Sequence, residues 1–202
     1  MKKSLFILLG LLTSVSVLAQ FVKEGEVPLD GITYEYGIVT HDDNSTTYEA
    51  TLTFGGIIDK DGNHVKRKNS IVDVPEYIEV GNNKYYVTCI GKDAFIDNSD
   101  VNYIIIPDYV NTIEKGAFQS MSNLRLIKLP KNIIAIDNSA FQNCNNLAHV
   151  WCNNPNPLTI SAENLFRNEC MTLYVPEGST GNFDEHWKKV FGDRIYEGEM
   201  VI

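Results

Sequence analysis

The sequence predicts a solenoid of stacked coils, each built from short strands and a tight turn. Two observations predict this fold class: apolar residues recur at a spacing of 23, and a proline follows the last apolar position of several copies. Alignment of residues 84–106, 107–129 and 130–152 stacks five apolar columns: Ala94-Phe95, Ala117-Phe118 and Ala140-Phe141; Ile90, Ile113 and Ile136; Val101, Leu124 and Leu147; Ile104, Ile127 and Val150; Ile106, Leu129 and Cys152. A coil of this length cannot bury its own apolar face, so it must stack on its neighbours.

One copy of the repeat contains two extended pieces and a turn. The spacing Leu124-x-x-Ile127-x-Leu129, which ends at Pro130, predicts a strand with Ile127 and Leu129 pointing inward. Residues 110–113 predict a second extended piece on the opposite side of the coil. The Ala-Phe pairs predict a tight turn or a single helical turn in which the phenylalanine enters the interior. Stacking then predicts a spine of aromatic rings: Phe95, Phe118, Phe141 and Phe166.

Degenerate copies extend the repeat in both directions. Residues 153–175 predict a fourth copy, with Leu158, Ile160 and Phe166 shifted by a short insertion. Residues 72–75 predict the strand of a copy that precedes the first. A hairpin that turns at residues 81–83 separates this strand from residues 87–90.

The repeat resembles a known family. Residues 107–130 and 130–152 follow the pattern Pro-x-x-Val-x-x-Ile-x-x-x-Ala-Phe-x-x-Cys-x-x-Leu-x-x-Ile-x-Leu-Pro, with Cys144 in the cysteine column of the second copy and Met121 in that of the first. This pattern is similar to the BspA-like leucine-rich repeats of bacterial surface and secreted proteins. The resemblance covers about residues 71–176. It implies a leucine-rich-repeat solenoid, a right-handed β/α superhelix rich in strands with short helical turns. It also implies an adhesin-like or host-interaction role, in which matrix or plasma proteins are bound.

Both ends of a solenoid need caps, because open ends expose unpaired strand edges and apolar surface. The alternation of apolar residues over 30–54 predicts an antiparallel hairpin over the N-terminal edge. Near the other end, Asn182 and Glu185 predict the start of a short amphipathic helix that ends before Gly192. The predicted organisation is a signal peptide at 1–19, an N-terminal β-hairpin cap at 20–70, leucine-rich repeats at 71–176 and a C-terminal helical cap at 177–202.

The first residues predict export. The chain starts with two basic residues, Lys2 and Lys3, residues 5–12 are apolar, and residues with small or short side chains precede a cleavage site near Ala19. The alternative, an uncleaved anchor, is disfavoured because the apolar run is shorter than the roughly 20 residues that a membrane span needs. We therefore expect a mature chain in the periplasm, on the cell surface or outside the cell, without stable membrane insertion.

The charge of the chain excludes nucleic acids as partners. The formal net charge is -9, and it becomes -11 after cleavage because residues 1–19 contain Lys2 and Lys3 but no acidic residue. A surface this acidic repels phosphate backbones and anionic lipids.

The sequence offers no catalytic constellation. The histidines, His41, His64, His149 and His186, lack the spacing of zinc ligands. Residues 59–63 are similar to the start of a calcium loop, but Ser70 occupies position twelve, so a turn is favoured. We expect no enzyme activity, no cofactor and no metal. A periplasmic hydrolase would require convergent polar groups that the sequence does not provide.

Four cysteines in an exported chain permit disulfides. Cys152 aligns with buried columns and is interpreted as a small buried hydrophobe, and Cys89 is placed on the outer side of its strand. Cys144 and Cys170 belong to adjacent coils, so the sequence allows a disulfide between them but does not decide whether it forms.

The outward positions of the predicted strands form two rows. One row contains Tyr103, Leu126, His149 and Thr172, and the other contains Asp73, Ile105, Lys128, Trp151 and Tyr174. Because neighbouring strands lie about 4.8 Å apart, the rows merge into a surface rich in aromatic and aliphatic groups. The candidate binding residues are Tyr103, Ile105, Leu126, Lys128, His149, Trp151 and Tyr174. The alternative is that the hairpin, the C-terminal tail or a second copy of the protein covers this face.

The sequence therefore predicts an exported, non-enzymatic module that binds a protein through its sheet face. A glycan is the less favoured ligand. The alternative function is a structural cell-envelope protein that self-associates through the same face.

Overall fold

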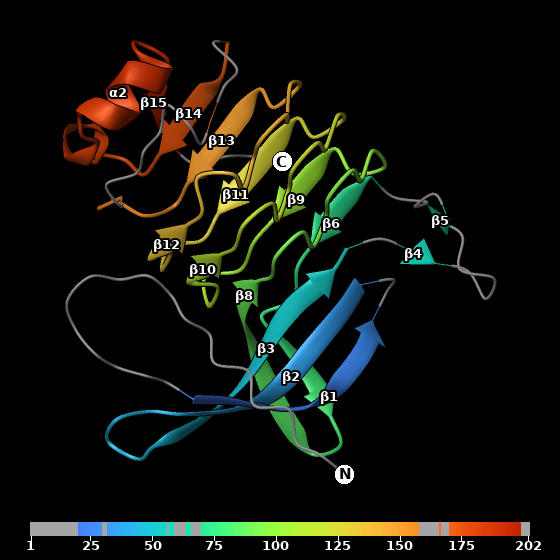
Figure 1. The fold of residues 1–202 in the computed structure, drawn as a ribbon. Coiled ribbons are helices and arrows are strands. Elements are labelled where there is room, and N and C mark those ends of the chain that lie inside the picture. The colour runs from blue at the N-terminus through green and yellow to red at the C-terminus, as the bar shows by residue number, and fades with distance from the viewer. Residues whose placement is uncertain are drawn as a thin grey trace.

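The computed structural model describes residues 20–29, 32–55, 57–58, 64–65, 70–157, 166 and 170–198. Its described strands form two larger sheets, which make the walls of the stacked coils, and a two-stranded sheet of β4 (Ile57–Ile58) and β5 (His64–Val65). Figure 1 shows β1 to β3 at one end of the stack and the helix α2 at the other. The predicted signal peptide, the turn at 59–63, Leu158 and Ile160 lie outside the described residues.

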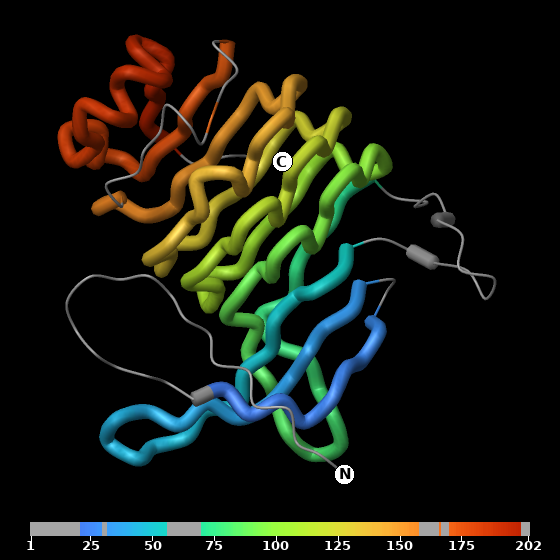
Figure 2. The backbone as a smooth tube through the Cα atoms, in the orientation of Figure 1, coloured from blue at the N-terminus to red at the C-terminus, as the bar shows by residue number. Residues whose placement is uncertain are grey.

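The first sheet has six strands in the order β15-β14-β13-β11-β9-β6, and all its neighbouring strands are parallel. The strands are β6 (Ile71–Asp73), β9 (Tyr103–Ile105), β11 (Leu126–Leu129), β13 (His149–Cys152), β14 (Thr172–Val175) and β15 (Ile195–Glu197). Val72, Ile104, Ile127, Val150 and Leu173 share one register row and are buried. The predicted inward column is therefore confirmed, and Figure 2 shows the chain winding through successive coils.

The second sheet has seven strands and joins the repeats to the N-terminal part of the chain. The strands are β1 (Gln20–Leu29), β2 (Ile32–Thr40), β3 (Thr46–Phe54), β7 (Tyr77–Val80), β8 (Asn83–Ile90), β10 (Thr112–Ile113) and β12 (Ala135–Ile136). The predicted hairpin is the antiparallel pair β2 and β3, and β3 pairs in parallel with β8. β7 and β8 form the other predicted hairpin, where Val80 pairs with Asn83.

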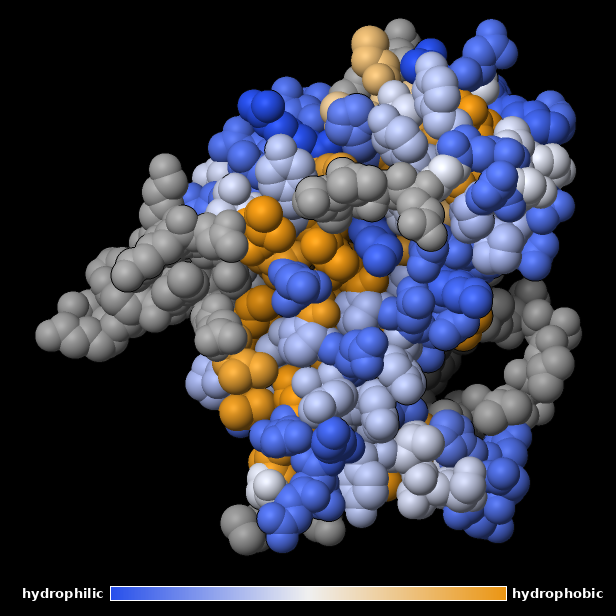
Figure 3. Space-filling model, turned by 180° about the vertical axis from the view of Figure 1, so that it is seen from behind, coloured by the Kyte–Doolittle hydropathy of each residue, from blue (hydrophilic) through white to orange (hydrophobic). Residues whose placement is uncertain are grey.

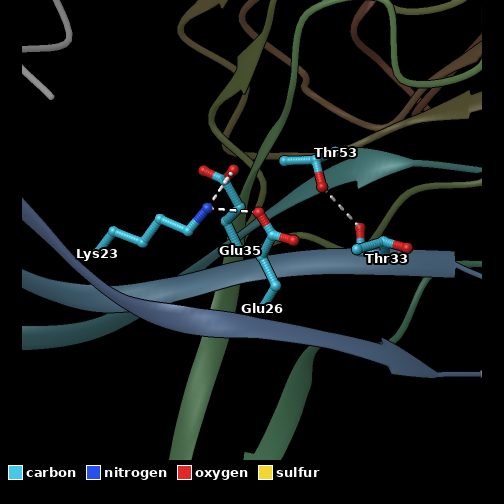
Figure 4. A network of polar contacts seen from close by, with 5 residues as sticks. All are labelled: Lys23, Glu26, Thr33, Glu35 and Thr53. Atoms are coloured by element: carbon cyan, nitrogen blue, oxygen red, sulfur yellow. Dashed lines mark hydrogen bonds and ion pairs between the residues drawn. The ribbon is translucent and has the colours of Figure 1, made fainter. Parts of the chain in front are cut away.

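Strand β1 was not predicted, because polar residues interrupt its apolar pattern. It pairs antiparallel with β2 and contains a bulge between Lys23 and Gly25. Lys23 extends between two carboxylates and reaches Glu35 at 2.7 Å and also Glu26 (Figure 4). Burial alone would lower the pKa of Lys23, but the hydrogen bonds and the negative charges of Glu26 and Glu35 together outweigh it and raise this pKa above its ordinary value. The hydrogen bond to Lys23 lowers the pKa of Glu26. Part of the pairing between β1 and β2 thus depends on charge.

The predicted phenylalanine spine is confirmed. The rings of Phe95 and Phe118 stack at 5.5 Å, those of Phe118 and Phe141 at 5.1 Å, and those of Phe141 and Phe166 at 5.2 Å. The last ring meets Phe191 of α2 edge-on at 5.7 Å, so the spine continues into the C-terminal helix. One column of the solenoid interior is therefore aromatic from Phe95 to Phe191.

The Ala-Phe segments are tight turns, as predicted, and they stack through the backbone. Phe95 N donates to Ala117 O at 2.7 Å, and Phe118 N donates to Ala140 O at 2.8 Å. Just beyond each phenylalanine, an equivalent residue has a positive φ: Asp97, Ser120 and Asn143. These left-handed residues lie 23 positions apart, so each coil reverses direction in the same way.

The C-terminal helix differs in detail from the prediction. Helix α2 (Glu185–Phe191) follows a short 3-10 helix, η1 (Thr180–Asn182), and its N-cap is Asp184 rather than Asn182. Asp184 fits better because its carboxylate accepts hydrogen bonds from the backbone N–H groups of His186 and Trp187. The apolar side of α2 is buried as expected through Trp187 and Phe191, and α2 ends before Gly192.

We expect Asp184→Ala to lower the free energy of unfolding by about 0.5–2 kcal/mol at pH 7, because two helix N–H groups lose their acceptor. Burial raises the pKa of Asp184, but the hydrogen bonds from Trp187 and His186 outweigh burial and lower it below its ordinary value. The stabilisation should therefore be complete above the unfolded pKa of about 3.9 and disappear as the pH falls through the lower folded value.

Urea unfolding of the wild type, Asp184→Ala and Asp184→Asn at pH 7 and pH 3 would test this expectation. Asparagine caps without a charge, so Asp184→Asn should keep most of the stability at pH 7. Equal stability of the wild type and Asp184→Ala at pH 7 would contradict it.

Candidate binding surface

The outer face of the six-stranded sheet carries the predicted candidate residues in the predicted rows. Tyr103 pairs with Leu126, Leu126 with His149, and His149 with Thr172. In the second row the partners are Asp73, Ile105, Lys128, Trp151 and Tyr174. The structure therefore brings all seven candidate residues onto one face, and their role in binding stays a prediction.

Two of the seven residues are not exposed, in contrast to the expectation. Leu126 is 8% exposed and Trp151 is 5% exposed. The indole of Trp151 stacks against the ring of Tyr174, with the ring centres 5.9 Å apart and an angle of 17° between the ring planes. The strands that carry Leu126 and Trp151 both have a paired strand on either side. Register therefore predicted the side on which they lie but not how far neighbouring groups cover them. The half-buried Tyr103, Ile105, Lys128, His149 and Tyr174 remain accessible.

The aromatic part of this face extends further than the sequence indicated. The ring of Tyr174 lies 6.2 Å from Tyr196 of β15, and Tyr196 is 54% exposed. We call Trp151, Tyr174 and Tyr196 the aromatic line. Sequence reasoning missed Tyr196 because it ended the fold with a helix, whereas Ile195 continues the inward row beside Leu173. The alternation in Ile195-Tyr196-Glu197 was the available signal.

His149 flanks the aromatic line and contacts the ring of Tyr174. Its ring lies 5.8 Å from Tyr174, and within the described part of the chain its buried Nδ1 has no hydrogen-bond partner. The ring is held mainly by packing, so it acts here as part of an aromatic surface.

Figure 3 shows apolar side chains gathered near the middle of the molecule, at the level of β6, β9 and β11, on the side that faces away from the viewer in Figure 1.

The thiols near the sheets are structural groups. Cys144 is buried and its Sγ lies 2.9 Å from Phe118 O, where it donates a hydrogen bond. Burial raises the pKa of both Cys144 and Cys152 to about 11, so these thiols stay protonated at neutral pH. Cys144 is a free thiol, so the disulfide with Cys170 that the sequence left open is not formed.

Comparison with known proteins identifies the repeat. A family model described as "BspA type Leucine rich repeat region (6 copies)" matches residues 76–185, more than half of the chain. The chain belongs to this family. The match runs from the strand β7 to the start of α2, so it includes the aromatic turns and most of the six-stranded sheet. A search of curated proteins finds no match.

A solved structure shows the same fold as this BspA-type chain. A leucine-rich repeat protein from Bacteroides capillosus is 21% identical, covers 87% of this chain and 100% of its own, and has a TM-score of 0.52. A leucine-rich repeat protein from Bacteroides ovatus is 24% identical over 75% of this chain and 37% of its own, with a TM-score of 0.48. At these identities the likeness concerns the fold alone. Among the described residues, no helix is long and apolar enough to cross a membrane.

Proposed function

We propose that this protein is an exported, non-enzymatic module that binds a partner protein through the outer face of its six-stranded sheet. The observation that carries the proposal is the aromatic line of Trp151, Tyr174 and Tyr196, which is already assembled on parallel strands. Such a surface loses little freedom on binding, because its side chains are already ordered. Tyr174 and Tyr196 are accessible, and tyrosine is one of the residues that most often dominate binding energy at protein interfaces, while the buried Trp151 packs against the ring of Tyr174.

The proposed partner is an extracellular protein, and the family resemblance suggests an adhesin-like interaction with a host matrix or plasma protein. The basic start and apolar run of residues 1–12 support export. A glycan is the less favoured ligand. The alternative function is self-association in the cell envelope through the same face, because an apolar surface of this kind also suits a second copy.

A binding screen would test the proposal. The mature chain, residues 20–202, would be tested against matrix proteins, plasma proteins and glycans beside a variant with Tyr103→Ala, Tyr174→Ala and Tyr196→Ala. We expect this variant to bind the identified partner at least tenfold more weakly, because truncation of interface tyrosines removes the largest contributions to binding.

A matched control removes three exposed apolar side chains elsewhere: Leu29→Ala, Ile96→Ala and Ile134→Ala. This control should bind like the wild type, and both variants should melt within a few degrees of it. A partner lost equally with both variants would contradict the proposed face. A mass that rises with protein concentration, together with a blank screen, would favour self-association.

A further inference from the structure

A cavity of about 450 Å³ opens on the seven-stranded sheet, away from the aromatic line. It lies where β1, β2 and β3 meet β8 and β10, and the repeat pattern gave no sign of it. The parallel pairing of β3 with β8 creates it, because this pairing places N-terminal strands beside the repeats. The lining residues used below are Phe21, Glu35, Glu49, Lys92, Thr112 and Glu114.

The charge of the cavity is negative. Glu35, Glu49 and Glu114 line it together with a single lysine, Lys92, so the formal charge of the acidic and basic lining residues is -2. Lys23, which pairs with Glu35, does not change this charge, because the carboxylate of its other partner, Glu26, offsets the charge of its ammonium group. The mature chain is itself strongly acidic, so its field adds to the local one.

The hydrogen bonds of the two carboxylates also favour a ligand that donates. Glu49 accepts from Thr88 Oγ1 at 2.7 Å and from Thr47 Oγ1 at 2.6 Å, and Glu114 accepts from Lys92 N at 2.8 Å. Each carboxylate oxygen has room for a second donor, so these groups keep unused acceptor capacity.

Several hydroxyl donors beside the cavity are already used. Thr53 donates to Thr33 O at 3.2 Å, and Thr112 donates to Asn111 Oδ1 at 2.8 Å (for Thr53, see Figure 4). The carboxylate oxygens of Glu35, Glu49 and Glu114 are therefore the charged acceptors of the described lining, beside the donors of Lys92 and Asn111. A complementary ligand must bring N–H donors and positive charge.

The apolar residues of the lining and the tyrosines beside the cavity are suited to contact the methylene groups of a lysine or arginine side chain. Phe21 and Val39, which pair across β1 and β2, supply apolar wall for a methylene stem. Beside the cavity, Tyr86 pairs with Glu49, and its ring packs at a tilt of 31° against the ring of Tyr109, with the ring centres 4.5 Å apart. Both rings are exposed, at 36% and 47%.

Of the tyrosines beside the cavity, Tyr77, Tyr86 and Tyr109, one already contacts a cationic group of the chain, the ammonium of Lys84. The ammonium of Lys84 lies 4.0 Å from the centre of the Tyr77 ring, and Tyr77 itself packs against Tyr86. Exposed aromatic faces and carboxylates both favour guanidinium and ammonium groups.

We propose that this cavity receives an arginine or lysine side chain from a basic segment of a partner protein. Glu49 and Glu114 bind the cationic head, Phe21 contacts the stem, and Tyr86 and Tyr109 form a shelf for the adjoining residues. This site is separate from the sheet face proposed above, so either can fail without the other.

Fluorescence anisotropy with a labelled hexa-arginine peptide would test the proposal on residues 20–202. The first variant combines Glu49→Gln and Glu114→Gln. Its matched control combines Glu177→Gln and Glu185→Gln, which removes the same charge at the other end of the solenoid. A third variant, Thr112→Trp, fills the cavity without changing the charge.

We expect the wild type to bind the peptide, with at least tenfold weaker binding for Glu49→Gln/Glu114→Gln and for Thr112→Trp. The control should change the affinity less than twofold. Equal weakening by the two double variants would overturn the proposal in favour of general charge attraction, and unchanged binding by Thr112→Trp would also overturn it. Absence of hexa-arginine binding, or tighter binding of a neutral hexasaccharide at this cavity, would overturn it as well. Thermal unfolding of each variant shows whether a loss of binding reflects a loss of fold.

Discussion

Replacement of Phe118 by alanine should lower the free energy of unfolding by about 3–5 kcal/mol. Phe118 is fully buried, and its ring stacks on Phe95 on one side and on Phe141 on the other. The substitution therefore leaves a void in the middle of the aromatic spine, where both neighbouring coils lose contacts. Because folded domains are stable by only about 5–15 kcal/mol, a loss of this size is readily measured.

Urea unfolding followed by circular dichroism would measure the effect. Ile134→Ala is the matched control, because it removes a large side chain from the same solenoid but from an exposed position. This control should stay within about 0.5 kcal/mol of the wild type. If Phe118→Ala unfolds at the wild-type urea concentration, the stacked spine does not stabilise the repeats.

Replacement of Gly55 by alanine should lower the free energy of unfolding by about 1–3 kcal/mol, because it overfills a packed site. A Cβ at Gly55 would overlap the ring of Phe95, the first member of the spine. Gly55 N also donates to Ala94 O at 2.7 Å, so the backbone cannot easily move away. Thermal unfolding of the variant would measure the loss.

A double-mutant cycle separates this overlap from other effects. Phe95→Leu removes the ring that a new Cβ would meet, so Gly55→Ala should cost less in that background than in the wild type. Simple additivity of the two changes would show that Gly55 is required for another reason.

The sequence predicted the repeats well because their apolar columns return at a fixed spacing. Once Ile104, Ile127 and Val150 share a column, the register of their strands and the side on which each neighbour lies follow directly. The pattern could not show how far Leu126 and Trp151 are covered, because coverage depends on packing above the sheet. It also missed β1, where polar residues interrupt the alternation and pairing depends partly on Lys23.

The cavity could not be predicted from the sequence for a different reason. Glu35, Glu49 and Glu114 are far apart in the chain and belong to no shared motif. Only the pairing of β3 with β8 brings them to one place, and the repeat spacing contains no information about that contact. Tyr196 could have been found, since the inward and outward alternation continues through β15.

The 23-residue return of the left-handed positions at Asp97, Ser120 and Asn143 makes the length of this molecule adjustable. A duplicated segment inserted at Pro130 would enter the stack with the same reversal of direction, and its Ala-Phe pair would add one ring to the column. Each insertion would widen the outer face of the six-stranded sheet by one strand, about 4.8 Å, while both chain ends keep their contacts. The width of this face can thus change by duplication of one repeat, while the contacts between the existing coils stay the same.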